Sequence, residues 1–192
     1  MKFKFINNVD AELFNSTQGA WTSQVAEHSA ETSATFYTAA LEYCGRIVNG
    51  GVTTDGGGCV CAVVDAGDVF ASALLVVSHA KGQGNLKMLN VYVQPSLNLA
   101  DSTPDRVQLA WIAATAIVGC LDLTYGKYPS EQLKMHTTFP LDKSFMTAVA
   151  TAVFADDRFS SMFDVESHGN WLVVTKKGGQ SHVQPFRVAP SG

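Results

Sequence analysis

The chain has 192 residues, of which 46% are apolar and 16% are charged, and its formal net charge is −4. This length and apolar content suffice for one well-filled core, so we expect a single domain. The 13 Lys and Arg residues are spread along the sequence without a cluster. Nucleic acid and an anionic membrane surface are therefore not expected as partners.

The first residues, MKFKFINNVDAELF, contain no apolar core of the kind found in signal peptides. The longest uncharged apolar run extends from Val107 to Leu121 and has 15 residues. A membrane-spanning helix needs about 20. This run therefore predicts a buried core helix.

Four cysteines are present: Cys44, Cys59, Cys61 and Cys120. Cys59 and Cys61 share one face of a predicted strand, and Cys120 lies in the apolar helix. None belongs to a Cys-x-x-Cys pair, and no His lies at metal-ligand spacing. We expect reduced, buried thiols in a cytoplasmic protein, and no metal site.

In chain order, the stretch KFKFINN alternates and predicts a short strand with Phe3 and Phe5 pointing inward. Two helices are then expected between Asp10 and about Gly45. Apolar residues recur at three- and four-residue spacing in both: Leu13, Phe14, Ala20, Trp21 and Val25 in the first, and Phe36, Tyr37, Ala40, Leu41 and Cys44 in the second.

After a glycine-rich loop, the stretches CVCAVVDAG, DVFASALLVVSHA and LKMLNVYV predict three successive antiparallel strands. Ser102 or Thr103 is expected to cap the long helix, with Pro104 at its first position. A strand at QLKMHTTF, a helix from Asp142 to about Phe154 and a hairpin from MFDVES and WLVVTKK follow. Residues 1–178 would form one domain, and residues 179–192 a loosely held polar tail.

The predicted element order is β-α-α-β-β-β-α-β-α-β-β. It combines an antiparallel meander with a strand–helix–strand crossover. This combination predicts the α+β, or mixed α/β, class, with a single central and mostly antiparallel sheet flanked by helices.

This layout, from Met1 to Lys177, resembles the GNAT fold of the Gcn5-related N-acetyltransferases. The stretch LNVYVQP resembles the fourth strand of the family, which reads L-x-V-x-P before its acyl-CoA loop. The stretch from Phe145 to Lys177 resembles the close of the family fold, in which a short helix and a bend precede a terminal hairpin.

The resemblance implies that the strand at Leu89 to Val93 parts from the strand at Gln132 to Phe139. Pantetheine of acetyl-CoA or another acyl-CoA would lie in this gap, on free backbone groups of Asn90, Val91, Tyr92 and Val93. The pyrophosphate would bind amides of the loop at residues 98–103, which include Ser102 and Thr103. The acyl group would pass to an amine of a small molecule or a protein.

The loop departs from the family pattern, because NLADST contains neither a glycine nor a basic residue. Glycine lets backbone approach a phosphate closely. Asp101 and Asp105 bring negative charge to a helix end that otherwise favours an anion. At ~6 Å and an effective dielectric constant of ~20, each unit charge pair costs roughly 2–3 kcal/mol before screening. Both acids also suit the first turn of their own helix.

His136 is the best single candidate for a general base, because it lies in LKMHTTF beside the proposed gap and imidazole titrates near neutrality. An ordinary strand His would have the same pattern. Asp65 and His79 are weaker candidates, since both lie at predicted turns. The family's usual acid is a Tyr after the penultimate helix, where this chain has Phe154 and Phe159.

Two functions remain open from the sequence. The first is an acyl-CoA-dependent N-acyltransferase of unknown acceptor with a degenerate cofactor loop. The second is a non-catalytic accessory or partner-binding protein on the same fold, for example a phage-encoded one. A homodimer with paired sheet edges is a further option.

Overall fold

A computed structural model describes residues 2–28, 31–50, 57–79, 84–98, 105–137, 141, 143–155 and 157–177. Its elements in chain order are β1 (Phe3–Ile6), α1 (Ala11–His28), α2 (Glu31–Val48), β2 (Gly58–Asp65), β3 (Ala73–His79), β4 (Asn85–Val93), α3 (Pro95–Asn98), α4 (Arg106–Tyr125), β5 (Gln132–His136), α5 (Lys143–Phe154), α6 (Asp157–Ser160), β6 (Phe163–His168) and β7 (Trp171–Lys176). The predicted order is confirmed, and the short helices α3 and α6 are additional. The expected tail, residues 179–192, lies outside the described residues.

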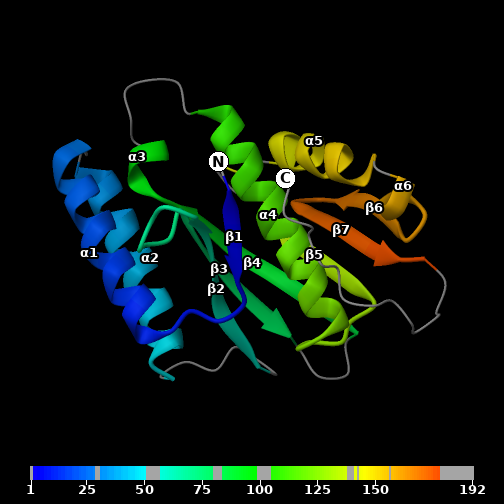
Figure 1. Cartoon of the computed structure of the whole chain (residues 1–192), viewed down its shortest axis with the longest axis horizontal. Coiled ribbons are helices and arrows are strands. Elements are labelled where there is room, and N and C mark those ends of the chain that lie inside the picture. Colours follow the sequence, from blue (N-terminus) through cyan, green and yellow to red (C-terminus); the bar gives the residue numbers. More distant parts are fainter. Residues whose placement is uncertain are drawn as a thin grey trace.

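The strands form one seven-stranded sheet in the order β1-β2-β3-β4-β5-β7-β6 (Figure 1). Strands β4 and β5 pair in parallel, and the connection between them contains α3 and α4. All other neighbours pair antiparallel. The predicted fold class, α+β with a single central and mostly antiparallel sheet flanked by helices, is therefore confirmed.

Helices cover the two faces of this sheet unequally. Alternate residues of β2 divide between two cores, because successive strand residues point to opposite faces. Cys61 and Val63 pack under α4 and α5, whereas Val60 and Ala62 pack against α1 and α2. The core beneath α1 and α2 does not extend to β5, β6 and β7. That part of the sheet face therefore carries no described helix.

The predicted apolar faces of α1 and α2 are largely confirmed. Trp21 and Tyr37 are fully buried, and their rings meet edge to face at 6.0 Å. Phe36 is an exception, because 48% of its surface is exposed. Its ring lies 6.0 Å from that of Tyr92 on β4, so it covers a strand residue from the edge of the core rather than filling the interior.

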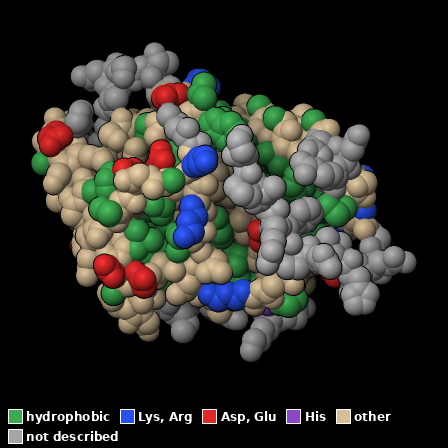
Figure 2. All heavy atoms as spheres, in the orientation of Figure 1, with side chains coloured by type: hydrophobic (Ala, Val, Ile, Leu, Met, Phe, Trp, Pro, Cys, Tyr) green, Lys and Arg blue, Asp and Glu red, His purple; other side chains and the backbone are tan. Residues whose placement is uncertain are grey.

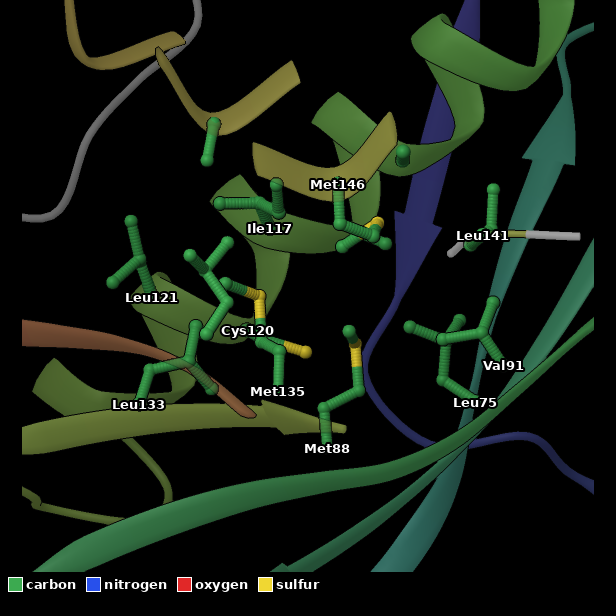
Figure 3. Packing of buried hydrophobic residues seen from close by; sticks show 14 of the residues in the cluster. Leu75, Met88, Val91, Ile117, Cys120, Leu121, Leu133, Met135, Leu141 and Met146 are labelled. Carbon is green, nitrogen blue, oxygen red and sulfur yellow. The ribbon is translucent and has the colours of Figure 1, made fainter. Parts of the chain in front are cut away.

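Helix α4 is the core helix that its apolar run predicts. Ile117 and Cys120 are fully buried, and Figure 3 shows them facing Met88 of β4 and Met135 of β5. By length and composition α4 could also span a membrane, yet 56% of its most apolar window is buried within the fold. Val107 and Trp111 were expected in the core but are 65% and 57% exposed, because both lie on the side of α4 turned away from the sheet.

The predicted start of α4 is wrong. The helix begins at Arg106, and its N-cap is Asp105, whose Oδ1 accepts hydrogen bonds from the backbone N–H groups of Val107 at 3.0 Å and Gln108 at 3.1 Å. Asp is as good an N-cap as Ser and better than Thr. Ser102, Thr103 and Pro104 thus precede the helix and lie outside the described residues.

Candidate functional site: the gap between β4 and β5

The two parallel strands part in the middle of the sheet. Their pairing runs from Asn85 opposite Gln132 to Met88 opposite Met135 and goes no further. Strand β4 continues to Val93, whereas β5 ends at His136. The register between β3 and β4 also shifts between Val76 and Val77. A bulge of this kind bends its strand, so β4 leaves β5 where the gap was predicted.

The register decides which β4 backbone groups face the gap. In an antiparallel pair, residues that exchange hydrogen bonds alternate with residues that do not. The N–H of Gln94 donates to the carbonyl of Ser72 on the β3 side at 2.9 Å. By alternation, Asn90 and Tyr92 bond to β3, and Val91 and Val93 turn their backbone groups toward β5. Of the four residues that the resemblance names, Val91 and Val93 thus turn their backbone groups toward the gap.

The carbonyl of Val93 is already engaged. It accepts a hydrogen bond of 3.0 Å from the hydroxyl of Tyr37 on α2. Nδ2 of Asn98 on α3 donates to the same hydroxyl, also at 3.0 Å. The backbone groups of Val91 and the N–H of Val93 therefore remain the strand groups that a ligand in the gap could bind.

Unpaired oxygens collect at this end of β4. Among the described residues, Ser72 Oγ, Gln94 Oε1 and Asn98 Oδ1 are buried and have no hydrogen-bond partner. The Asn98 amide orientation follows from its neighbour, since the Tyr37 hydroxyl donates to Val93 and must accept from Asn98. Buried oxygens without a partner are costly. They fit a ligand that donates N–H groups.

These groups suit pantetheine better than diphosphate. The pantetheine arm carries two amide N–H donors and two carbonyl acceptors, which match the free oxygens and the free strand N–H groups. Ionised diphosphate offers acceptors alone. The first amides of α4, an ordinary anion site, are used by the Asp105 carboxylate. Asp101, Ser102 and Thr103 lie outside the described residues, so their roles remain predictions.

His136 is the one of the three candidate bases that borders the gap. It directly follows Met135, the last residue of β5 paired with β4. Its half-buried ring lies 4.9 Å from that of Trp171 on β7. Asp65 pairs with Phe3 at the outer strand. His79 is at the opposite end of β3, where its Nε2 lies 3.3 Å from the Pro129 carbonyl oxygen.

Tyr92 is a candidate acid whose side chain the sequence prediction did not consider. It is half-buried and packs on the helix-α2 side of the sheet. Burial chiefly, with Cys44 and Tyr43, raises the pKa of Tyr92 to about 12. The phenol therefore holds its proton at neutral pH. Phe154 and Phe159 form an edge-to-face pair in the core and offer no hydroxyl.

A hollow lies on the sheet face that carries no described helix. It has a volume of about 430 Å³ and is lined by Lys87, Gln132, Lys134, Glu166, His168, Trp171, Val173 and Thr175. Lys134 lies two residues before His136 on β5 and so points to the same face of the sheet, and Trp171 of β7 pairs with His136. The hollow therefore begins beside the apex of the gap. Within the described ranges, no group of three or more His, Cys, Asp or Glu side chains is placed to hold a metal ion.

Comparisons with known proteins do not assign this chain to a family. No protein-family model matches the chain, and no curated protein matches it. Similar solved structures include a GNAT-family acetyltransferase from Bacillus anthracis, with 12% identity over 91% of this chain and 92% of that one and a TM-score of 0.45. RimJ from Mycobacterium smegmatis in complex with CoA-disulfide has 11% identity over 89% and 86% and a TM-score of 0.44.

The PaiA N-acetyltransferase from Thermoplasma acidophilum, in complex with coenzyme A, has 10% identity over 93% of this chain and 100% of that one, with a TM-score of 0.41. With TM-scores below 0.5, these matches define no family for this chain. The fold class rests on the strand order and the pairing of β4 with β5.

Proposed function

We propose that the chain binds the pantetheine arm of an acyl-CoA between β4 and β5 and transfers the acyl group to an amine. The observation that carries this proposal is the end of the parallel ladder at Met88 and Met135, five residues before the end of β4. The partnerless oxygens of Gln94 and Asn98 support it, because pantetheine supplies the donors that they need.

Residues around the gap have distinct roles in this proposal. The N–H of Val91 hydrogen-bonds the thioester carbonyl oxygen and stabilises the charge that develops there. His136 accepts a proton from the attacking amine. Tyr92, which keeps its proton at neutral pH, donates to the departing thiolate. The amine approaches from the hollow beside Trp171, and much of the rate comes from holding both reactants together.

A second candidate is a partner-binding protein that catalyses nothing. One observation favours it: the Asp105 carboxylate bonds the first amides of α4, next to the loop at residues 98–103 where the resemblance puts the pyrophosphate of coenzyme A. Without that anchor, an acyl-CoA would be held by its pantetheine arm alone. A binding measurement with pantetheine and acyl-CoA separates the two candidates.

The first experiment is a thermal-shift titration with pantetheine, coenzyme A and acetyl-CoA. A ligand at 100 times its dissociation constant stabilises the folded state by about 2.7 kcal/mol. We expect all three compounds to raise the melting temperature. No shift at millimolar concentrations of any of them would rule out the enzyme and leave the partner-binding protein.

The second experiment tests catalysis with His136→Ala and, as a matched control, His79→Ala. His79 lies at the end of β3 away from the gap, and its Nε2 is 3.3 Å from the Pro129 carbonyl oxygen. Loss of a general base typically costs 10²–10⁴-fold in rate. We expect that loss of amine acylation for the His136 variant, with unchanged acetyl-CoA binding, and a normal rate for the His79 variant.

A further inference from the structure

Two thiols lie in contact beneath α4, at the end of β2 away from the gap. Cys59 and Cys61 point to the same face of the strand, and their Sγ atoms are 3.6 Å apart. Both sulfurs also lie close to the backbone carbonyl of Asn7, at 3.4 Å and 3.5 Å. The exposed fraction of Cys59 is 5%, whereas Cys61 is fully buried.

Three side chains beside the outer sulfur favour its thiolate, whereas the Asn7 carbonyl oxygen favours its thiol. A hydrogen bond from Cys61 lowers the pKa of Cys59 most, and Tyr128 and Lys127 lower it further, whereas burial opposes them. The pKa of Cys61 is raised, because its thiol proton is shared with Cys59 and because it is buried. One sulfur is thus prepared as a nucleophile, and its neighbour keeps a proton.

A surface hollow is lined by two residues that neighbour this pair. A hollow of about 460 Å³ is lined by Asn7 and Lys127, together with residues of β1 and α4. These are the residues that supply the carbonyl beside both sulfurs and the ammonium that acts on Cys59. Two strands, β3 and β4, separate β2 from the gap, so the thiol pair is a separate site.

We infer that Cys59 and Cys61 form a redox dithiol, a modification site that reacts with small disulfide oxidants. The Cys59 thiolate attacks one sulfur of the oxidant R–S–S–R, which forms a mixed disulfide and releases one R–S⁻. The Cys61 thiol passes its proton to that thiolate and attacks Cys59 Sγ, which expels the second R–S⁻. The second R–S⁻ takes up from solvent the proton that Cys59 released on ionising, so the dithiol loses two hydrogens in all and the oxidant becomes two R–SH.

The resulting bridge is expected to be easy to reduce. Residues two apart on a strand have Cα atoms ~6.7 Å apart, near the upper limit of ~6.8 Å for a disulfide. Closure therefore strains β2, and strained disulfides have more oxidising potentials. This strain makes the modification reversible by ordinary thiols.

The test uses the reduced, folded chain and glutathione disulfide, with intact mass spectrometry and peptide mapping after acid quenching. We expect the chain to lose the mass of two hydrogens, with the bridge between Cys59 and Cys61, and to regain it with reduced glutathione. Cys61→Ser should retain one glutathione on Cys59, because the second step is blocked. Cys59→Ser should form no bridge between these positions and retain no glutathione. Cys44 is a buried thiol in the other core, so Cys44→Ser should behave like the unmodified chain.

A bridge between other cysteines, an unchanged reaction of Cys59→Ser, or no oxidation of the folded chain would overturn the inference. A second measurement needs no variant. Phenylarsine oxide places one arsenic across two neighbouring thiols, so the folded chain should bind one phenylarsine and protect Cys59 and Cys61 from alkylation. Failure of that protection would equally overturn it. Neither readout depends on acyl-CoA binding.

Discussion

The hydroxyl of Tyr37 donates a hydrogen bond of 3.0 Å to the carbonyl of Val93, which ties helix α2 to the half of β4 that has left β5. Tyr37 is buried, and burial raises its pKa despite the hydrogen bond from Asn98. This contact replaces a bond that a neighbouring strand would supply in an uninterrupted sheet.

Tyr37→Phe should destabilise the fold, because it leaves the Val93 carbonyl and Asn98 Nδ2 without their shared partner. Each such buried group costs about 1–3 kcal/mol. Tyr43→Phe on the same helix is the control and should stay within about 0.5 kcal/mol of the parent. Urea denaturation of the two variants measures the difference, and equal midpoints would contradict the role assigned to Tyr37.

Gly119→Ala should destabilise the chain by about 1–3 kcal/mol or more, as overpacked cores do. A methyl group at Gly119 of α4 would overlap the Phe5 ring of β1. Gly19 of α1 has nothing within 4 Å of the same added atom. Gly19→Ala should therefore stabilise its helix by up to about 1 kcal/mol. Thermal melts should show a lower melting temperature for Gly119→Ala and a higher one for Gly19→Ala. An unchanged melting temperature for Gly119→Ala would show that β1 moves aside at little cost.

Asp105→Asn should strengthen coenzyme A binding, because Asn still caps α4 and removes the charge that repels the pyrophosphate. We expect about a tenfold gain, equivalent to about 1.4 kcal/mol, and no change for pantetheine. Asp10→Asn is the matched control, since Asp10 Oδ1 accepts from the N–H of Leu13 at the start of α1. Asp101→Gly should act in the same direction as Asp105→Asn. Equal coenzyme A affinities in parent and variants would contradict the repulsion.

Alkylation of Cys59 by iodoacetamide should rise through a midpoint below the usual thiol pKa of 9.0, because the hydrogen bond from Cys61 chiefly, with Tyr128 and Lys127, lowers the pKa of Cys59. Cys44, whose burial raises its pKa to about 12, should not react in that range. Lys127→Gln should move the Cys59 midpoint upward, since it removes a cation that favours the thiolate. A midpoint near 9 in the parent chain would contradict the lowered pKa.

The same pKa has a consequence for stability. Between the lowered pKa of the folded chain and the usual value of 9.0, the unfolded chain holds a proton on Cys59 that the folded chain has lost, so this thiol's contribution to stability rises with pH across that window. It is complete above pH 9 and is lost as the pH falls through the pKa of the folded chain. The raised pKa of Cys61 acts in the opposite direction above pH 9. Denaturation midpoints of the parent and Cys59→Ser at several pH values measure the effect.

The sequence predicted the fold well because its strands and helices carry strong periodic patterns. Residues such as Trp21, Ile117 and Leu133 recur on buried faces, and their positions fixed the element order. The exposed Trp111 could not be foreseen, since an unbroken apolar run does not reveal which side of a helix meets the sheet. The cap of α4 was missed because Ser102, Thr103 and Asp105 are all competent N-caps.

The parting of β4 from β5 was predicted, but its details were not. The local stretch LNVYVQP indicated where β4 would leave β5, but not the bulge beside Val76 or the alternation that turns Val91 rather than Tyr92 toward the gap. The contact of Tyr37 with Val93 joins residues 56 apart in sequence, and periodicity carries no information about such pairs. The contact of Cys59 with Cys61 was foreseeable, since residues two apart on a strand share a face.

The most direct test is an equilibrium titration of the parent chain with pantetheine and with coenzyme A at the same ionic strength. If the gap holds the pantetheine arm and Asp105 excludes the pyrophosphate, both compounds should bind with dissociation constants within a factor of about ten, or about 1.4 kcal/mol. Coenzyme A that binds at least about a hundredfold more tightly than pantetheine, about 2.8 kcal/mol, would contradict that division of the site.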